Sequence, residues 1–133
     1  MKKINIWLAL VLLVTVSIFV TMNIHAVKKI TTGILLNSNL LNEMKVGGEL
    51  GWFYHEENGS TGYTWHFTPD NSGVYRAVEE VVLLPSVNGA VGVPGSHIWK
   101  FKALRKGRGK ILFDLYRAGE KPVETVIVQI EVK

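Results

Sequence analysis

Hydrophobic and polar residues alternate along several short stretches of the chain, which is typical of β-strands with one buried face. In the stretch 49–55, Leu50, Trp52 and Tyr54 share one face of the predicted strand. The other predicted strands are 34–36, 64–67, 75–84, 97–104, 111–116 and 125–132. After residue 29, no stretch repeats hydrophobic residues at the spacing of a helix.

Segments rich in glycine, asparagine or proline separate these strands, at 47–48, 58–62, 69–73, 86–95 and 107–109. Short strands joined by such turns predict an all-β fold, an antiparallel β-sandwich. The inward positions would be Leu50, Trp52, Trp65, Trp99, Phe101, Phe113, Leu115, Val126 and Val128. Each large side chain contributes roughly 1.5–3 kcal/mol when fully buried, so this set is sufficient for an independent domain.

The N-terminal segment has the features of an export signal. Lys2 and Lys3 precede an uncharged, mostly apolar run, 4–26. This run approaches the ~20 residues that span a bilayer as a helix. A signal peptide cleaved after Ala26 and an uncleaved signal anchor therefore both fit residues 1–26. Either one places the domain, 27–133, outside the cytoplasm, secreted or held at the outer face of the membrane.

Composition excludes several functional classes. The chain of 133 residues contains no cysteine, which excludes disulfides, a thiol nucleophile and cysteine-ligated metals. The formal net charge is +4. Without Lys2 and Lys3, 13 of the 15 basic residues remain against 11 acidic ones. This surplus is too small to indicate a nucleic-acid partner.

The sequence shows no arrangement of residues typical of a catalytic, cofactor or metal site. The histidines lack metal-ligand spacing, and Ser96-His97 does not lie in a G-x-S-x-G motif. The pairs Glu56-Glu57 and Glu79-Glu80 are poor candidates for an acid/base pair, because adjacent residues on a strand point to opposite faces. We therefore expect no enzyme. His55 and His66 flank a predicted hairpin, where we expect an exposed pair on a sheet face.

Six basic residues and no acidic residue lie between Lys100 and Lys110. Such a run could contact anionic lipids or an acidic partner. The interpretation we favour is a solvated hairpin, because hairpin tips are commonly charged.

The segment 58–65, Asn-Gly-Ser-Thr-Gly-Tyr-Thr-Trp, lies between two predicted strands. Asn-Gly tolerates positive φ and predicts a hairpin, and the following Ser-Thr-Gly makes the loop longer than a two-residue turn. We expect Trp65 to anchor this loop in the core, so that a compact tip is presented to solvent. Asn58-Gly59-Ser60 is also an N-glycosylation acceptor sequence, and a glycan there would cover the tip.

This segment resembles the Asn-Pro-Thr-Thr-Gly-Tyr-x-Trp signature of the chagasin family of cysteine protease inhibitors. A second family element resembles Gly92-Val93-Pro94-Gly95, followed by Trp99. A third, Arg-Pro-Trp-Glu, aligns with Arg117-Ala118-Gly119-Glu120, in which the proline and the tryptophan are missing. The three elements follow the family's order and cover roughly 44–132.

The resemblance implies an immunoglobulin-like sandwich that inhibits papain-like cysteine proteases as a monomer without a cofactor. Three loops at one end would occlude the protease cleft. The implied contact residues are Asn58, Gly59, Ser60, Thr61, Gly62, Tyr63, Gly92, Val93, Pro94, Gly95, Arg117, Ala118 and Gly119. The lost proline–tryptophan pair leaves an alternative open, an exported or membrane-anchored interaction module without inhibitory activity.

The leader generates the first prediction. If it remains as an anchor, the protein made in its native host should fractionate with membranes and resist a high-salt wash, because a bilayer-spanning segment is held by its apolar surface. Recovery of a mature chain beginning at Val27 in the soluble exported fraction would show that the leader is cleaved.

Overall fold

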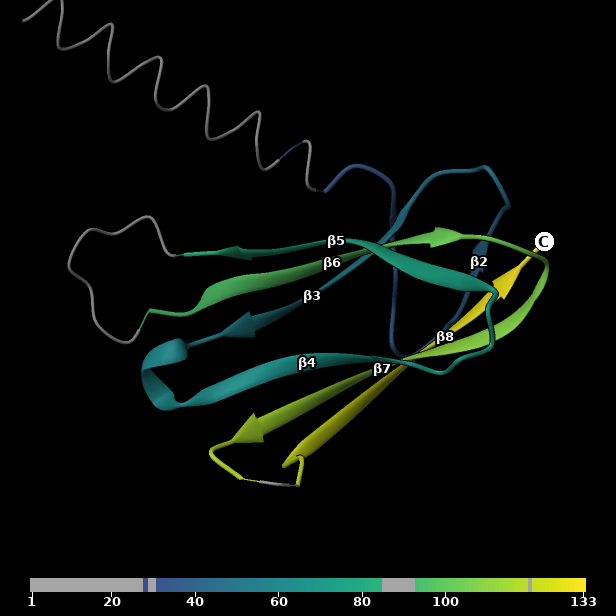
Figure 1. The fold of residues 1–133 in the computed structure, drawn as a ribbon. Helices are drawn as coiled ribbons and strands as arrows, with labels where there is room; N and C mark the ends of the chain where they lie inside the picture. The colour runs from purple at the N-terminus through teal and green to yellow at the C-terminus, as the bar shows by residue number, and fades with distance from the viewer. Residues whose placement is uncertain (1–27, 29–30, 85–92, 120) are drawn as a thin grey trace, which may run out of the picture. The chain divides into compact units, whose positions relative to one another are not determined.

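The computed structural model describes residues 28, 31–84, 93–119 and 121–133 (Figure 1). The predicted leader, 1–26, and its expected helix lie outside these residues. Within the described ranges, no helix has the length and hydrophobicity needed to span a bilayer. The chain divides into two units, Met1–Thr32 and Gly33–Lys133, and the second contains the described strands.

Two four-stranded sheets form the described part of Gly33–Lys133 (Figure 1). The first has the order β1 (Ile34–Leu35), β3 (Gly51–Glu57), β6 (Gly95–Ala103), β5 (Tyr75–Leu83). The second has the order β2 (Leu41–Met44), β8 (Glu124–Val132), β7 (Gly107–Arg117), β4 (Tyr63–Pro69). The short strands β1 and β2 pair in parallel with their neighbours, and the other described pairings are antiparallel. The predicted immunoglobulin-like sandwich is confirmed.

Aromatic rings fill the space between the two sheets. Phe113 of β7 is completely buried, and its ring centroid lies 4.7 Å from that of Phe53 and 4.9 Å from that of Trp99. The predicted inward residues Trp65, Trp99, Phe101, Phe113 and Val128 are buried, and Leu115 and Val126 pack against them. Because apolar burial is the largest favourable term in folding, this cluster holds the sheets together.

The prediction for the inward face of β3 is wrong. Phe53 is buried, whereas Tyr54 is 46% exposed and stacks on Trp52 on the other face. Leu50 lies before the strand begins. Gly51 also faces the core, where a Cβ on it would lie 3.0 Å from the side chain of Leu36, closer than ordinary contact. Phe53 and His55 share its orientation, because successive residues of a strand alternate between its two faces.

Two predicted hairpins are instead connections between the sheets. β3 pairs with β6 and β4 pairs with β7, so the loop 58–62 passes from one sheet to the other. The segment between β6 and β7 also changes sheets, so the basic run between Lys100 and Lys110 does not follow one hairpin.

Three basic residues of that run, Lys100, Arg105 and Arg108, have separate structural partners. Lys100 is 5% exposed and forms an ion pair of 3.2 Å with Glu79. Arg105 donates a hydrogen bond of 3.2 Å to the carbonyl oxygen of Gly73. Arg108 pairs with Glu131 at 3.0 Å. Lys100 is therefore part of the folded core of the sheet, whereas Lys102, Arg105, Lys106, Arg108 and Lys110 are exposed to solvent, as expected.

The orientation of β3 can be tested by comparing two neighbouring aromatic residues. Phe53→Ala should lower the free energy of unfolding by about 3–5 kcal/mol, because it leaves a cavity against Phe113. Tyr54→Ala, on the exposed face, should cost about 1 kcal/mol or less. Denaturant unfolding measures both values. A larger loss for Tyr54→Ala than for Phe53→Ala would contradict this assignment.

Candidate functional site

The register of the strands brings the three predicted contact segments to one end of the sandwich. Glu57, the last residue of β3, pairs with Gly95, the first of β6. In the other sheet, Tyr63 at the start of β4 pairs with Arg117 at the end of β7. The loop 58–62, the start of β6 and the end of β7 consequently lie at the same end (Figure 1). Gly92 lies outside the described residues.

The loop 58–62, here called the tip loop, contains one 3₁₀ turn, Gly59–Thr61. Asn58 caps this turn, since its Oδ1 accepts hydrogen bonds from the Ser60 amide at 3.2 Å and the Ser60 hydroxyl at 2.7 Å. The Thr61 hydroxyl donates to the carbonyl oxygen of Asn58 at 2.6 Å. Gly62 ends the turn at φ 75°, a conformation that favours glycine. Short polar side chains thus order the loop internally.

The surface of the tip loop is open. Residues 59–62 are exposed, and a Cβ added to Gly59 or Gly62 would meet no atom within 4 Å. Tyr63 is half-buried, and the guanidinium carbon of Arg117 lies 5.2 Å from the centre of its ring. This cation–π contact joins the strand residue that follows the tip loop to the last residue of β7.

The loop after β7 begins with a residue in an unusual conformation. Ala118 has φ 40°, in the left-handed region that costs a residue with a side chain roughly 1–2 kcal/mol. Proline, whose ring fixes φ near −65°, cannot adopt this conformation. The absence of the family's proline therefore matches the local backbone. A Cβ on Gly119 would lie 3.3 Å from the carbonyl oxygen of Arg117, a tight but not prohibitive contact.

The described part of the remaining segment is Val93, Pro94 and Gly95. Val93 and Pro94 are exposed, with 38% of Val93 accessible. Gly95 is buried, and a Cβ there would lie 2.3 Å from the carbonyl oxygen of Leu83. Only glycine permits this close approach of β6 to β5.

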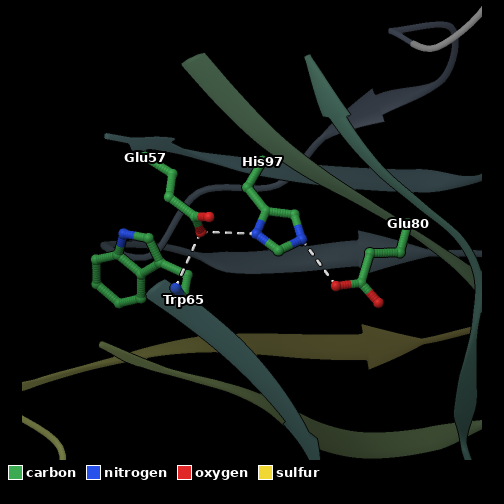
Figure 2. A network of polar contacts seen from close by, with 4 residues as sticks. All are labelled: Glu57, Trp65, Glu80 and His97. Atoms are coloured by element: carbon green, nitrogen blue, oxygen red, sulfur yellow. Dashed lines mark hydrogen bonds and ion pairs between the residues drawn. The ribbon is translucent and has the colours of Figure 1, made fainter. Parts of the chain in front are cut away.

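A polar network that the sequence analysis did not predict lies at the base of the tip loop (Figure 2). Glu57 Oε2 accepts a hydrogen bond from the Trp65 backbone amide at 3.0 Å and lies 2.9 Å from His97 Nδ1. His97 Nε2 lies 2.7 Å from Glu80 Oε1. Glu57 and His97 are 40 residues apart in the chain, so no local motif indicates their contact.

His55 and His66 do not form the exposed pair that the sequence predicted. His55 points to the core and stacks on Trp65, with ring centroids 3.7 Å apart and planes 6° from parallel. His66 is exposed and packs edge-on against Tyr116, with ring centroids 5.3 Å apart. They separate because neighbouring residues on a strand point to opposite faces, and on β4 it is Trp65 that points to His55 and the core, so His66 points outward. Burial, and to a smaller extent the electrostatic effect of His97, lower the pKa of His55 from 6.5 to about 4.

The described residues contain no cluster of three or more histidine, aspartate or glutamate side chains able to hold a metal ion. What the end of the sandwich presents is a short, internally bonded loop between two flanking segments. Such a surface suits binding to another molecule.

Comparison with known proteins identifies the family. The family model described as chagasin family peptidase inhibitor I42 matches residues 47–132. The chain belongs to this family. The family consists of peptidase inhibitors and not enzymes. A search of curated protein sequences found no match.

Solved structures support the fold of this chagasin-family chain. The cysteine protease inhibitor EhICP2 from Entamoeba histolytica is 18% identical, with a TM-score of 0.60, over 75% of this chain and 95% of that one. Amebosin is 21% identical, with a TM-score of 0.58, over 76% of this chain and 98% of that one. At these identities the likeness shows the shared fold alone.

The environment of His55 predicts a pH-dependent stability. The unfolded chain binds a proton at this histidine near pH 6.5, but the folded chain does so only near pH 4. Between these values the unfolded state holds more protons, so the free energy of unfolding falls as the pH falls through this window. Melting temperatures across the window should show a steeper acid loss for the native chain than for His55→Phe. Parallel profiles for the two proteins would contradict the assignment.

Proposed function

We propose that this protein inhibits papain-like cysteine proteases by inserting the tip loop into the catalytic cleft. The observation that carries the proposal is the tip loop itself, exposed at residues 59–62 and ordered by its own hydrogen bonds. Val93 and Pro94 would lie along one side of the cleft, with Gly92 and Gly95 as their neighbours. Arg117, Ala118 and Gly119 would lie along the other side.

Inhibition by this arrangement is steric. A protease cleaves a peptide only when the scissile carbonyl is held in attack geometry. The tip loop is a 3₁₀ turn, closed by the amide of Thr61 on the carbonyl oxygen of Asn58 at 3.0 Å, and this turn does not present an extended peptide. Ser60 and Thr61 would lie nearest the catalytic cysteine and histidine. No covalent step is required.

Internal order favours tight docking. The hydroxyl groups of Ser60 and Thr61 already have partners within the loop. A loop that is ordered before binding loses less conformational entropy when it docks. Gly59 and Gly62 add no side chain that would keep the backbone away from the walls of a narrow cleft.

We also propose that the domain acts outside the cytoplasm, as the basic and apolar leader suggests. The protease it meets would then be an extracellular or periplasmic enzyme, or one in a compartment of the export route.

A second candidate is an interaction module that has kept the sandwich and lost inhibition. The observation that favours it lies in the loop after β7, where Ala118 has φ 40° and Gly119 replaces the family's aromatic residue. Aromatic side chains often dominate the binding energy of an interface.

Titration against papain separates the two candidates. The protein should inhibit papain, and Gly62→Trp should abolish inhibition because an indole at the tip is too large for the cleft. Gly47→Trp is a matched control, since Gly47 has φ 71° against 75° for Gly62 and equally open surroundings. Gly47 lies before β3, at the opposite end of that strand, and its variant should inhibit normally.

Both tryptophan variants carry the same backbone strain of about 1–2 kcal/mol, so their melting temperatures should fall equally. Absence of papain inhibition by the unchanged protein at micromolar concentration would favour the interaction module. Equal inhibition by the unchanged protein and Gly62→Trp would exclude the tip loop from the cleft.

Placing an aromatic side chain in the loop after β7 tests whether this loop contacts the protease. Gly119→Trp should tighten papain binding by about 2 kcal/mol, on the order of 30-fold in Kd, by adding apolar contact beside the cleft. Gly119→Ala is the control, because it creates the same tight contact with the Arg117 carbonyl without the indole. A folded Gly119→Trp protein that binds no better than Gly119→Ala would mean that this loop does not touch papain.

A further inference from the structure

Glu57 occupies the point where the tip loop leaves the first sheet. Its side chain is 12% exposed, which is low for a carboxylate. The loop it precedes connects β3 to β4, two strands that share no ladder of backbone hydrogen bonds. Any contact across the base of the loop therefore comes from side chains.

The Glu57 carboxylate makes such a contact with Trp65. β4 is an edge strand, paired on one side with β7. An edge strand has backbone amides that face away from its neighbour and lack a ladder partner. The Trp65 amide donates to Glu57 Oε2 at 3.0 Å (Figure 2). Glu57 thus supplies the acceptor that a neighbouring strand would otherwise provide.

His97 contacts the same oxygen of the Glu57 carboxylate, Oε2. Ionised carboxylates accept hydrogen bonds and do not donate them. One carboxylate oxygen lies 2.9 Å from His97 Nδ1 and another lies 2.7 Å from Nε2, so both ring nitrogens of His97 contact a carboxylate. The ring is fixed in turn by stacking on Trp99, with centroids 3.9 Å apart. Glu57 thus contacts an imidazole ring whose position is fixed by Glu80 and Trp99.

We propose that Glu57 is the positioning residue of the tip loop, fixing the distance between its two ends and the direction in which the tip projects. The inference rests on the proposed function, because it assigns the residue on which presentation of the inhibitory loop depends. Without the Glu57 oxygen, the start of β4 would lose its acceptor on the side away from β7. The segment that is not held by the strands would then extend from 58–62 towards 58–65. Ordering this longer segment on docking would cost more conformational entropy.

Three substitutions in the full chain, kept in detergent, isolate this role. Glu57→Leu removes the acceptor while keeping similar bulk. Glu57→Gln keeps an oxygen that can accept from the Trp65 amide. Glu80→Gln is the matched control, because Glu80 contacts His97 rather than the Trp65 amide, and its side chain is 59% exposed. Amide hydrogen exchange by mass spectrometry compares the segment 58–65 with the core segment 126–132, and papain titration gives the Kd.

Glu57→Leu should speed exchange in 58–65 by on the order of 10-fold, the effect of one lost partner for a buried polar group, and weaken papain binding by a similar factor. Exchange in 126–132 should stay unchanged. Glu57→Gln and Glu80→Gln should both remain close to the native chain. Recovery by glutamine shows that the oxygen acceptor, rather than the charge, positions the loop.

Unchanged exchange in 58–65 for Glu57→Leu would overturn the proposal, and so would equal acceleration in 58–65 and 126–132. If Glu57→Leu does not fold, Glu57→Asp retains the charge but shortens the reach, and unchanged exchange in that variant would also overturn it. Failure of the native chain to inhibit papain would remove the proposed function alone. Selective acceleration in 58–65 would still support the role of Glu57 in ordering the loop.

Discussion

Contact between the two sheets through Phe113 is the interaction on which the rest of the molecule depends. Its ring, on β7, meets Phe53 and Trp99 of the opposite sheet, and Phe67 of the neighbouring strand β4. These contacts fix the separation and relative rotation of the layers. This packing also sets the arrangement of the candidate loops. The tip loop connects the two sheets, so the distance between its ends depends on how far apart the sheets lie.

The loops at this end differ in how their order is achieved. The tip loop is stabilised locally, by a capped turn, and from beneath, by a carboxylate between a backbone amide and a histidine. The loop after β7 begins with a left-handed alanine and a glycine, next to the cation–π contact between Arg117 of β7 and Tyr63 of β4. Affinity for a cleft would therefore come mainly from insertion of the tip, with a weaker contribution from the side.

Much of the fold could be predicted because some strands have one purely apolar face. In β8, Val126, Val128, Ile130 and Val132 leave no doubt about orientation. In β3, the consecutive residues Trp52, Phe53 and Tyr54 make both faces look apolar, and contacts with the other sheet place Phe53 inside. Alternation within a strand is local information, so it gives this strand two equally good orientations.

Partner strands and side-chain networks are set by contacts between residues far apart in the sequence. Asn-Gly indicates a turn but not whether the turn stays within one sheet. The predicted compact tip and the burial of Trp65 were correct, because both follow from residue type. The contact between Glu57 and His97 and the left-handed φ of Ala118 form only in the folded sandwich. No short sequence motif predicts either of them.

Because the tip loop crosses from one sheet to the other, proteolytic cleavage within it would leave strands of both pieces in both sheets. Suppose the peptide bond between Ser60 and Thr61 were cut. The N-terminal piece would still contribute β3 to one sheet, beside β6, and β2 to the other, beside β8. Strand pairing on both layers would hold the nicked ends together, so a cut protein would keep the shape of an intact one and would not be released as two products.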